Sequence, residues 1–173
     1  MSFAIRQLGP DDTAAFRALR LEALLDSPEA FGGDHAEESQ FPLEAFDKQI
    51  TSNAIFGLFQ DETLCGIVGL YWSTGAKVGH HAHLYSVYLT PAARGTGSAL
   101  PLIEAALDHA KTLGKLQVAL GVSIHNTPAI ALYRKAGFEI YGTEPRSLYV
   151  AGRYIDEHLM VRFLDKAPGV EHD

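Results

Sequence analysis

The sequence has little sulfur and no long apolar run. Only one cysteine, Cys65, occurs among 173 residues, so the chain cannot form an internal disulfide and suits a reducing compartment. Because Cys65 lies in the apolar run from Leu64 to Leu70, we expect a buried thiol rather than a nucleophile. No window approaches about eighteen apolar residues, and no basic segment precedes a long apolar one at the N-terminus. These absences predict a soluble, cytoplasmic protein that does not enter a membrane.

Positive charge is also scarce. Lys and Arg number 14 against 21 Asp and Glu, which gives a formal net charge of −7. Nonspecific binding to nucleic acid depends on basic side chains that neutralise phosphates, so this balance argues against a nucleic-acid partner. The negative balance mildly favours a cationic partner, although solubility alone explains it more simply.

The length suits one domain. We expect residues 1–166 to form it and residues 167–173 to be a short polar tail. A chain of this size buries roughly two thirds of its unfolded surface without disulfides or metals. The sequence contains no internal repeat, and it leaves monomer and homodimer equally open.

The hydrophobic pattern alternates between strands and helices. The first helix is expected to bury Ala14, Ala18, Leu21 and Leu25, and Asp11 or Asp12 is expected to cap it. Residues 27–41 read as a loop that, with the next helix, is a candidate for the acceptor side. Strands are predicted at residues 3–8, 54–59, 63–72, 81–89, 116–122, 138–141, 147–150 and 154–164, and helices at about 13–25, 43–50, 99–113 and from 127 onward.

One strand-helix-strand unit stands out, formed by residues 81–89, 99–113 and 116–122. Such a connection is right-handed and makes its two strands parallel, so ligands are expected at their shared C-terminal end. The remaining strands read as antiparallel. The predicted fold class is therefore α/β (α+β), a single mixed, mostly antiparallel sheet with one parallel pair and about four flanking helices.

A glycine-containing turn joins the first strand of this unit to its helix. The turn lies at a helix N-terminus, where unpaired N–H groups and the macrodipole favour a phosphate or pyrophosphate. A simple tight turn is the alternative, because isolated glycine pairs often serve only that purpose. The pattern is neither a dinucleotide fingerprint nor a Walker loop. The turn reads Pro91-Ala92-Ala93-Arg94-Gly95-Thr96-Gly97-Ser98-Ala99, and the helix carries apolar residues at Ala99, Ile103, Ala106, Ala110 and Leu113.

Two motifs, in order, resemble those of the GCN5-related N-acetyltransferase (GNAT) superfamily. Arg94-x-x-Gly97-x-Ala99 resembles its acetyl-CoA loop, Gln/Arg-x-x-Gly-x-Gly/Ala. Residues 126–138 resemble its later motif, Asn-x-x-Ala-x-x-Leu-Tyr-x-x-x-Gly-Phe. The resemblance covers most of the chain and implies the superfamily's fold, in which the two parallel strands splay apart around the pantetheine arm of acetyl-CoA.

The resemblance also implies which residues contact acetyl-CoA, the expected co-substrate. Asn126 matches an asparagine that contacts the cofactor arm, and it also suits a helix cap; the two roles are compatible. Backbone donors aimed at the acetyl oxygen would stabilise the oxyanion during attack. The main chain of Val87, Tyr88 and Leu89 would bind the pantetheine and the acetyl carbonyl, and the amides of Arg94, Gly95, Thr96, Gly97, Ser98 and Ala99 would hold the pyrophosphate.

Tyr133 matches the family's tyrosine near the sulfur of CoA. A phenol with an ordinary pKa of about 10 is protonated at neutral pH and can give its proton to the departing thiolate. The alternative is that Tyr133 only packs within an apolar helix.

The general base is harder to assign. Many relatives carry a glutamate on the strand that enters the turn, but this chain has no Asp or Glu between Glu62 and Glu104. His81, His83 and Tyr85 share a strand face, and His83 falls at the first position of a histidine pair found in some relatives, with Tyr85 at the second. An imidazole can serve as base directly or through water. A structural His83, a water chain, or a loop carboxylate such as Glu37 or Glu38 remain alternatives.

Other cues are weaker. Neighbouring histidines at 80, 81 and 83 alternate between faces and lack a second ligand cluster, so we expect no metal. Asp156 and Glu157 recur in similar acetyltransferases; a solvated strand face is favoured over acceptor binding. Tyr71 and Trp72 end a strand near the expected acceptor cleft, although aromatic residues there usually belong to the core.

The sequence thus predicts an acetyl-CoA-dependent N-acetyltransferase in which a primary amine attacks the thioester directly in a ternary complex. The expected acceptor is a small-molecule or amino-acid-like amine. Alternatives are a protein N-terminus or lysine as acceptor, or a non-catalytic acyl-CoA-binding sensor. Retention of Tyr133 favours an enzyme, whereas the missing strand carboxylate keeps the sensor open.

Overall fold

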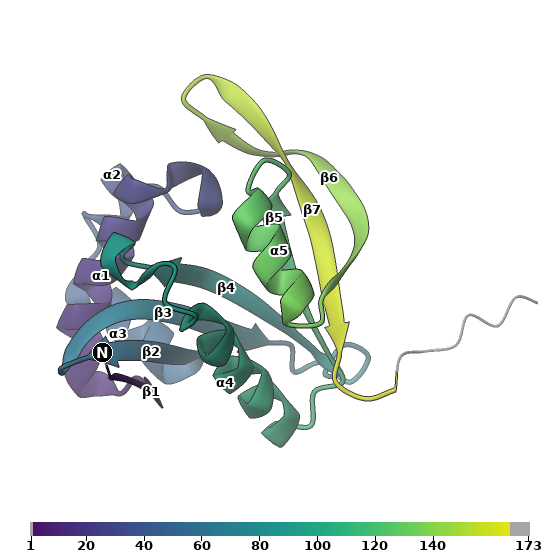
Figure 1. Cartoon of the computed structure of the whole chain (residues 1–173), viewed down its shortest axis with the longest axis horizontal. Helices are drawn as coiled ribbons and strands as arrows, with labels where there is room; N and C mark the ends of the chain where they lie inside the picture. The colour runs from purple at the N-terminus through teal and green to yellow at the C-terminus, as the bar shows by residue number, and fades with distance from the viewer. Residues whose placement is uncertain (1, 167–173) are drawn as a thin grey trace, which may run out of the picture.

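A computed structural model describes residues 2–166, so the tail expected at 167–173 lies outside the described residues. Its strands form one seven-stranded sheet in the order β1-β2-β3-β4-β5-β7-β6 (Figure 1). The strands are β1 (Phe3–Gln7), β2 (Ala54–Gln60), β3 (Thr63–Trp72), β4 (His81–Leu89), β5 (Gln117–Ser123), β6 (Glu139–Val150) and β7 (Arg153–Phe163). The helices are α1 (Thr13–Asp26), α2 (His35–Glu38), α3 (Leu43–Ser52), α4 (Ala99–Thr112) and α5 (Thr127–Lys135), with 3₁₀ turns at Pro10–Asp12, Pro28–Ala30 and Pro91–Ala93.

The sheet has one parallel pair, β4 with β5, and every other neighbouring pair within residues 2–166 is antiparallel. Helix α4 connects the two parallel strands, as the strand-helix-strand pattern requires. The predicted fold class is confirmed. In the same described range, no helix has both the length and the apolar character needed to cross a membrane.

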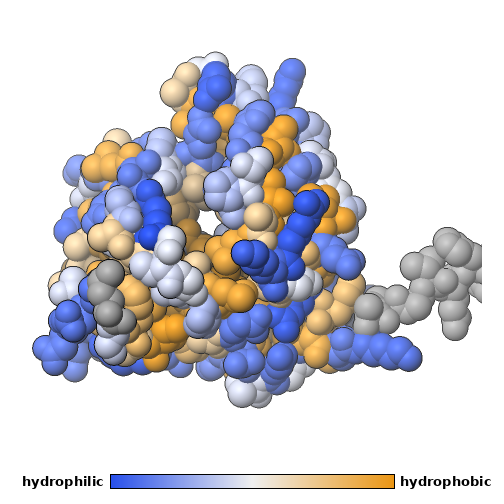
Figure 2. Space-filling model, in the orientation of Figure 1, coloured by the Kyte–Doolittle hydropathy of each residue, from blue (hydrophilic) through white to orange (hydrophobic). Residues whose placement is uncertain are grey.

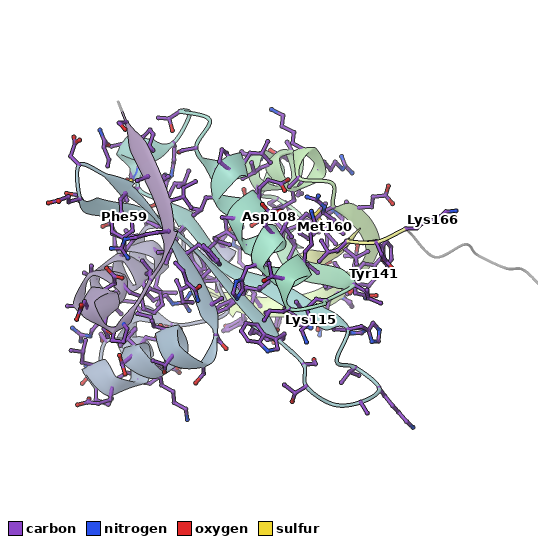
Figure 3. The ribbon with its side chains drawn as sticks, turned by 90° about the horizontal axis from the view of Figure 1, so that it is seen from below. Phe59, Asp108, Lys115, Tyr141, Met160 and Lys166 are labelled. Carbon is purple, nitrogen blue, oxygen red and sulfur yellow. The ribbon has the colours of Figure 1, made fainter. Side chains whose placement is uncertain are left out.

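Helices cover both faces of the β1–β4 half of the sheet (Figure 1). Strand β2 alternates between two apolar clusters: Phe56 and Leu58 pack with α4, whereas Ile55 and Phe59 pack with α1 and α3. Both faces of β2 are therefore buried, which explains its unbroken apolar sequence. Figure 3 shows the span of the sheet, with Phe59 of β2 on one side and Tyr141 of β6 on the other.

The buried face of α1 differs from the prediction. Ala14 and Ala18 are exposed, and Leu25 is 65% exposed. The buried face is rotated about the helix axis relative to the predicted face. It includes a charged side chain, Arg20, which a count of apolar positions leaves out. The buried residues are Thr13, Phe16, Leu19, Arg20, Ala23 and Leu24. Asp12 does not cap α1 with its side chain; its carboxylate instead accepts hydrogen bonds from Arg6 and from the N–H of Gly9.

Helix α4 ends one residue earlier than predicted. Leu113 follows the last helical residue and is partly exposed, while Gly114 adopts φ 73° as the expected C-terminal glycine. The buried face is formed by Leu102, Ile103, Ala106, Leu107 and Ala110.

The two short strands predicted at 138–141 and 147–150 are one strand, β6. Its ladder with β7 shifts register between Ile140 and Gly142 and again between Glu144 and Leu148. Arg146 adopts a positive φ of 51° within the second shift. Pro145 has no N–H to donate to a ladder, and a bulge on an edge strand is one of the few places in a sheet that tolerates this. The sequence pattern alone indicates a break between two strands there.

Candidate active site

Strands β4 and β5 form a fork. They pair at only three positions, His81 with Gln117, Ala82 with Val118 and His83 with Ala119. Beyond His83 the strands diverge, and a cavity of about 930 Å³ opens between β4 residues 84–89 and β5 residues 119–123. Figure 2 shows the surface hollowed at the centre of the view, between the α1 side and the α5 side in Figure 1. The expected splay is therefore present.

A bulge in β4 lies in the cavity wall. Ile67 pairs with Tyr88 and Gly69 with Tyr85, so two β4 residues, Ser86 and Val87, face one residue of β3. Ser86 adopts a positive φ of 52°. The bulge interrupts the β3–β4 ladder where β4 borders the cavity, and it changes which side chains face the helices.

A buried ion pair anchors this bulge. Arg20 donates from Nε and Nη2 to the two carboxylate oxygens of Glu38, at 3.0 and 2.8 Å, and from Nη1 to the hydroxyl of Ser86 at 2.7 Å. Both ionic side chains are only 11% exposed. The pair thereby fixes α1, α2 and the bulge of β4 relative to one another.

The same ion pair shapes the loop before α2. A Cβ on Gly33 would lie 2.1 Å from Oε1 of Glu38 and 2.5 Å from Nη2 of Arg20, so a side chain there would have to displace the ion pair. Phe31, Gly32 and Gly33 form part of the cavity wall. Both oxygens of Glu38 already bind Arg20, and Glu37 is exposed and absent from the cavity wall. Neither loop carboxylate is placed to act as a base.

Backbone conformation, rather than lack of space for a side chain, favours glycine in the turn before α4. Gly95 and Gly97 have φ values of 73° and 79°, and a Cβ on either would meet no atom within 4 Å. Thr96 donates to the carbonyl of Ala93 at 2.7 Å and shares a 2.8 Å hydrogen bond with Ser98. These bonds hold the turn directly before α4.

The predicted cofactor-binding residues are divided between the cavity wall and the turn beside it. Thr96, Gly97 and Ser98 do not line the cavity, and Ser98 is buried. The side chain of Arg94 turns toward α1, where it pairs with Asp26, and its Nε donates to the carbonyl of Leu89 at 3.1 Å. This pairing lowers the pKa of Asp26. The predicted residues in the wall are Val87, Tyr88, Leu89, Arg94, Gly95, Ala99 and Asn126.

Asn126, which caps α5, and Tyr133 of α5 both line the cavity. Oδ1 of Asn126 accepts a hydrogen bond from the N–H of Ala129 at 3.3 Å, so the predicted helix cap is confirmed. Tyr133 is 7% exposed, and burial raises the pKa of its phenol. The hydroxyl is therefore protonated at neutral pH.

His83 stands where the fork begins. Its ring stacks on Tyr71, with ring centres 4.8 Å apart and an interplanar angle of 14°. Burial, together with the nearby charge of His81, lowers the pKa of His83 and leaves its imidazole neutral near pH 7. Tyr71 also lines the cavity, so it belongs to the site rather than to the core.

Glu157 is the residue that sequence reasoning placed wrongly. The sequence pattern favours a solvated strand face, but Glu157 lines the cavity, on β7, and β5 separates this strand from the β4 strand of His83. Its carboxylate lies over Gly121, where a Cβ would be 3.5 Å from Oε1. The regular β5–β7 register puts Glu157 on the same face as Leu159 and Val161. A carboxylate in an otherwise apolar row was the available signal.

A parallel fork that opens on a cavity, followed by a glycine turn at a helix N-terminus, defines the acyl-CoA N-acyltransferase class of fold. Within residues 2–166, no group of three or more His, Cys, Asp or Glu residues is arranged to hold a metal ion. The chain belongs to the Acetyltransferase (GNAT) family, whose sequence profile matches residues 19–138.

Two acetyltransferases of known name are similar to this chain in sequence. A mycothiol acetyltransferase of Renibacterium salmoninarum is 33% identical over 143 residues, which cover 79% of this chain and 40% of that protein. A spermidine N(1)-acetyltransferase of Vibrio cholerae is 28% identical over 65% of this chain and 66% of its own length. The chain thus spans about two fifths of the mycothiol acetyltransferase.

A solved structure has the same fold. It is yncA of Salmonella typhimurium, a putative acetyltransferase with its cofactor acetyl-CoA, and it superposes with a TM-score of 0.80. The match covers 99% of both chains at 21% identity.

Proposed function

We propose that the protein is an N-acetyltransferase that moves the acetyl group of acetyl-CoA to a primary amine of a small molecule. The observation that carries this proposal is the β4–β5 fork, which opens into a cavity with the glycine turn at its edge. An extended, amide-bearing arm can pair with strand backbone that has no strand partner, and a pyrophosphate suits the adjoining helix N-terminus.

The residues of the fork fit the cofactor. The main chain of Val87, Tyr88 and Leu89 would bind the pantetheine arm and the acetyl carbonyl. Amides of residues 94–99 would hold the pyrophosphate, and Asn126 would contact the arm. Both glycines leave open space beside the backbone, so a phosphate can approach closely.

The reaction is a direct acyl transfer. The amine nitrogen attacks the thioester carbonyl, a C–N bond forms, and the C–S bond breaks to release CoA thiolate. Tyr133 would give its proton to that thiolate, since a phenol is protonated at neutral pH. Cys65 is buried, and its thiol donates to the carbonyl of Leu58, so Cys65 is not placed to form a covalent acetyl-enzyme intermediate.

His83 is the proposed base. Its lowered pKa keeps the ring nitrogen available near neutral pH, and from the start of the fork it would take a proton from the attacking amine, directly or through a water. The unsuitable placement of Glu37 and Glu38 strengthens this assignment. A cavity that contains a protonated phenol and a neutral imidazole also favours an enzyme over a non-catalytic sensor.

Release of CoA from acetyl-CoA tests the function. A panel of small amines, amino acids, and peptides with free N-termini or lysines is incubated with the protein and acetyl-CoA. We expect release with small amines and a product mass increased by one acetyl group. Tight acetyl-CoA binding without release by any panel member would favour a sensor, and release by peptides alone would favour a protein acceptor.

A further inference from the structure

The charged side chains of the cavity wall are not equally available to a ligand. Arg20 is neutralised by Glu38, and Arg94 is paired with Asp26. Glu157 also lines the cavity, and within residues 2–166 it has no salt-bridge partner. The part of the cavity near Glu157, which we call the acceptor end, therefore presents a negative charge that no basic side chain of the wall neutralises.

Local structure fixes this carboxylate in place. The hydroxyl of Ser147, on the neighbouring strand β6, donates to Oε1 of Glu157, and Oε2 of Glu144 lies 3.3 Å away as a second acceptor for the same proton. Within the described residues, Oε2 of Glu157 has no hydrogen-bond partner. The carboxylate lies over Gly121, at ordinary contact distance from the position that a Cβ would occupy there. A half-buried carboxylate with one unused oxygen is suited to receive a cation.

Aromatic rings line the same cavity. Tyr71 and Tyr85 meet edge to face, with ring centres 5.4 Å apart, and Tyr141 of β6 is 60% exposed. Figure 3 shows Tyr141 on the β6 side of the molecule. Phenol rings offer apolar area and faces that attract ammonium groups.

We propose that Glu157 is the acceptor-binding residue, and that the site takes cationic amines that lack a carboxylate, with the ammonium of the acceptor held at Glu157. This inference rests on the proposed function and names the acceptor class of the same site. An α-carboxylate on the acceptor would meet the charge of Glu157 and would find both cavity arginines already paired. Amino acids are therefore poor acceptors compared with the amines derived from them.

Matched pairs test this selectivity. We would compare tyramine with tyrosine, and putrescine with ornithine, because each pair differs by one carboxylate. For the parent protein we expect kcat/KM to be at least tenfold higher for the amine of each pair. The Glu157→Gln variant should lose at least tenfold in kcat/KM for both amines, mainly through KM, while KM for acetyl-CoA stays the same. Glu157→Asp, which keeps the charge, should recover part of the loss.

Glu139→Gln is the matched control, because Glu139 is an exposed carboxylate on the neighbouring strand β6 that does not line the cavity. It should retain parent selectivity. Equal use of amine and amino acid, or unchanged kinetics for Glu157→Gln, would overturn the inference and leave the proposed function standing. Acetylation of none of the four compounds would also overturn it, whereas failure of the whole amine panel described above would contradict the proposed function itself.

Discussion

The two ends of the cleft are built by different means. At the cofactor end, the turn around Gly95 and Gly97 is formed by consecutive residues, and the groups proposed to bind acetyl-CoA are backbone amides. At the acceptor end, His83, Tyr141 and Glu157 come from three different strands, and the proposed contacts are side chains. The comparison teaches that a binding site made of backbone groups can be recognised from one short sequence motif, whereas a site made of side chains depends on how distant strands are arranged in the sheet.

The first prediction breaks the cofactor end. Gly97→Glu puts a side chain at φ 79° and a carboxylate beside the expected pyrophosphate. Strain and like-charge repulsion should weaken acetyl-CoA binding by about 100-fold or more, measured by calorimetric titration. Gly152→Glu is the matched control, because Gly152 has the same φ in the β6–β7 turn, away from the cavity. Parent affinity in Gly97→Glu would remove the turn from the binding site.

The second prediction concerns the scaffold that joins the two ends. Glu38→Ala leaves the buried guanidinium of Arg20 without its counter-ion, so the free energy of unfolding should fall by about 3–5 kcal/mol. Urea denaturation measures the change. Glu37→Ala, at the exposed neighbouring position, should stay within about 0.5 kcal/mol of the parent. Equal stability of the two variants would show that the ion pair does not anchor the bulge.

The third prediction separates chemistry from binding. Tyr133→Phe keeps the ring in its buried place but removes the proton donor, so kcat should drop by about 100-fold while the Kd for acetyl-CoA is unchanged. Steady-state kinetics and calorimetry give the two quantities. Tyr149→Phe, which removes an exposed phenol, should behave as the parent does. Full activity of Tyr133→Phe would exclude Tyr133 as the acid.

The smallest expected effect concerns His83. If neutral His83 is the base, kcat/KM rises with pH as the imidazole loses its proton, with a midpoint below the ordinary histidine pKa of about 6.5, and is level above it. His83→Ala should abolish this rise and lower the plateau by about tenfold, since water can replace the base in part. His80→Ala should keep the parent profile. An unchanged pH–rate profile in His83→Ala would exclude His83.

The sequence predicted the elements that depend on neighbours along the chain. The parallel strand pair, the glycine turn, the cap by Asn126 and the shared face of His83 and Tyr85 follow from local pattern and strand alternation, whereas the parting of β4 and β5 is implied only by the resemblance to the GNAT superfamily. It failed where distant segments meet. The burial of Arg20 depends on Glu38, and the place of Glu157 in the cavity wall depends on the parting of β4 and β5. Periodicity counts apolar residues, so it assigns a charged residue to solvent unless its partner is known.

The central claim is that the parted strands β4 and β5 receive acetyl-CoA. A crystal structure of the protein with acetyl-CoA tests it most directly. The account predicts the pantetheine arm between the two strands, hydrogen-bonded to the main chain of residues 87–89, and the pyrophosphate on the amides of residues 94–99. Acetyl-CoA bound elsewhere, with the strands paired beyond His83 and Ala119, would contradict it.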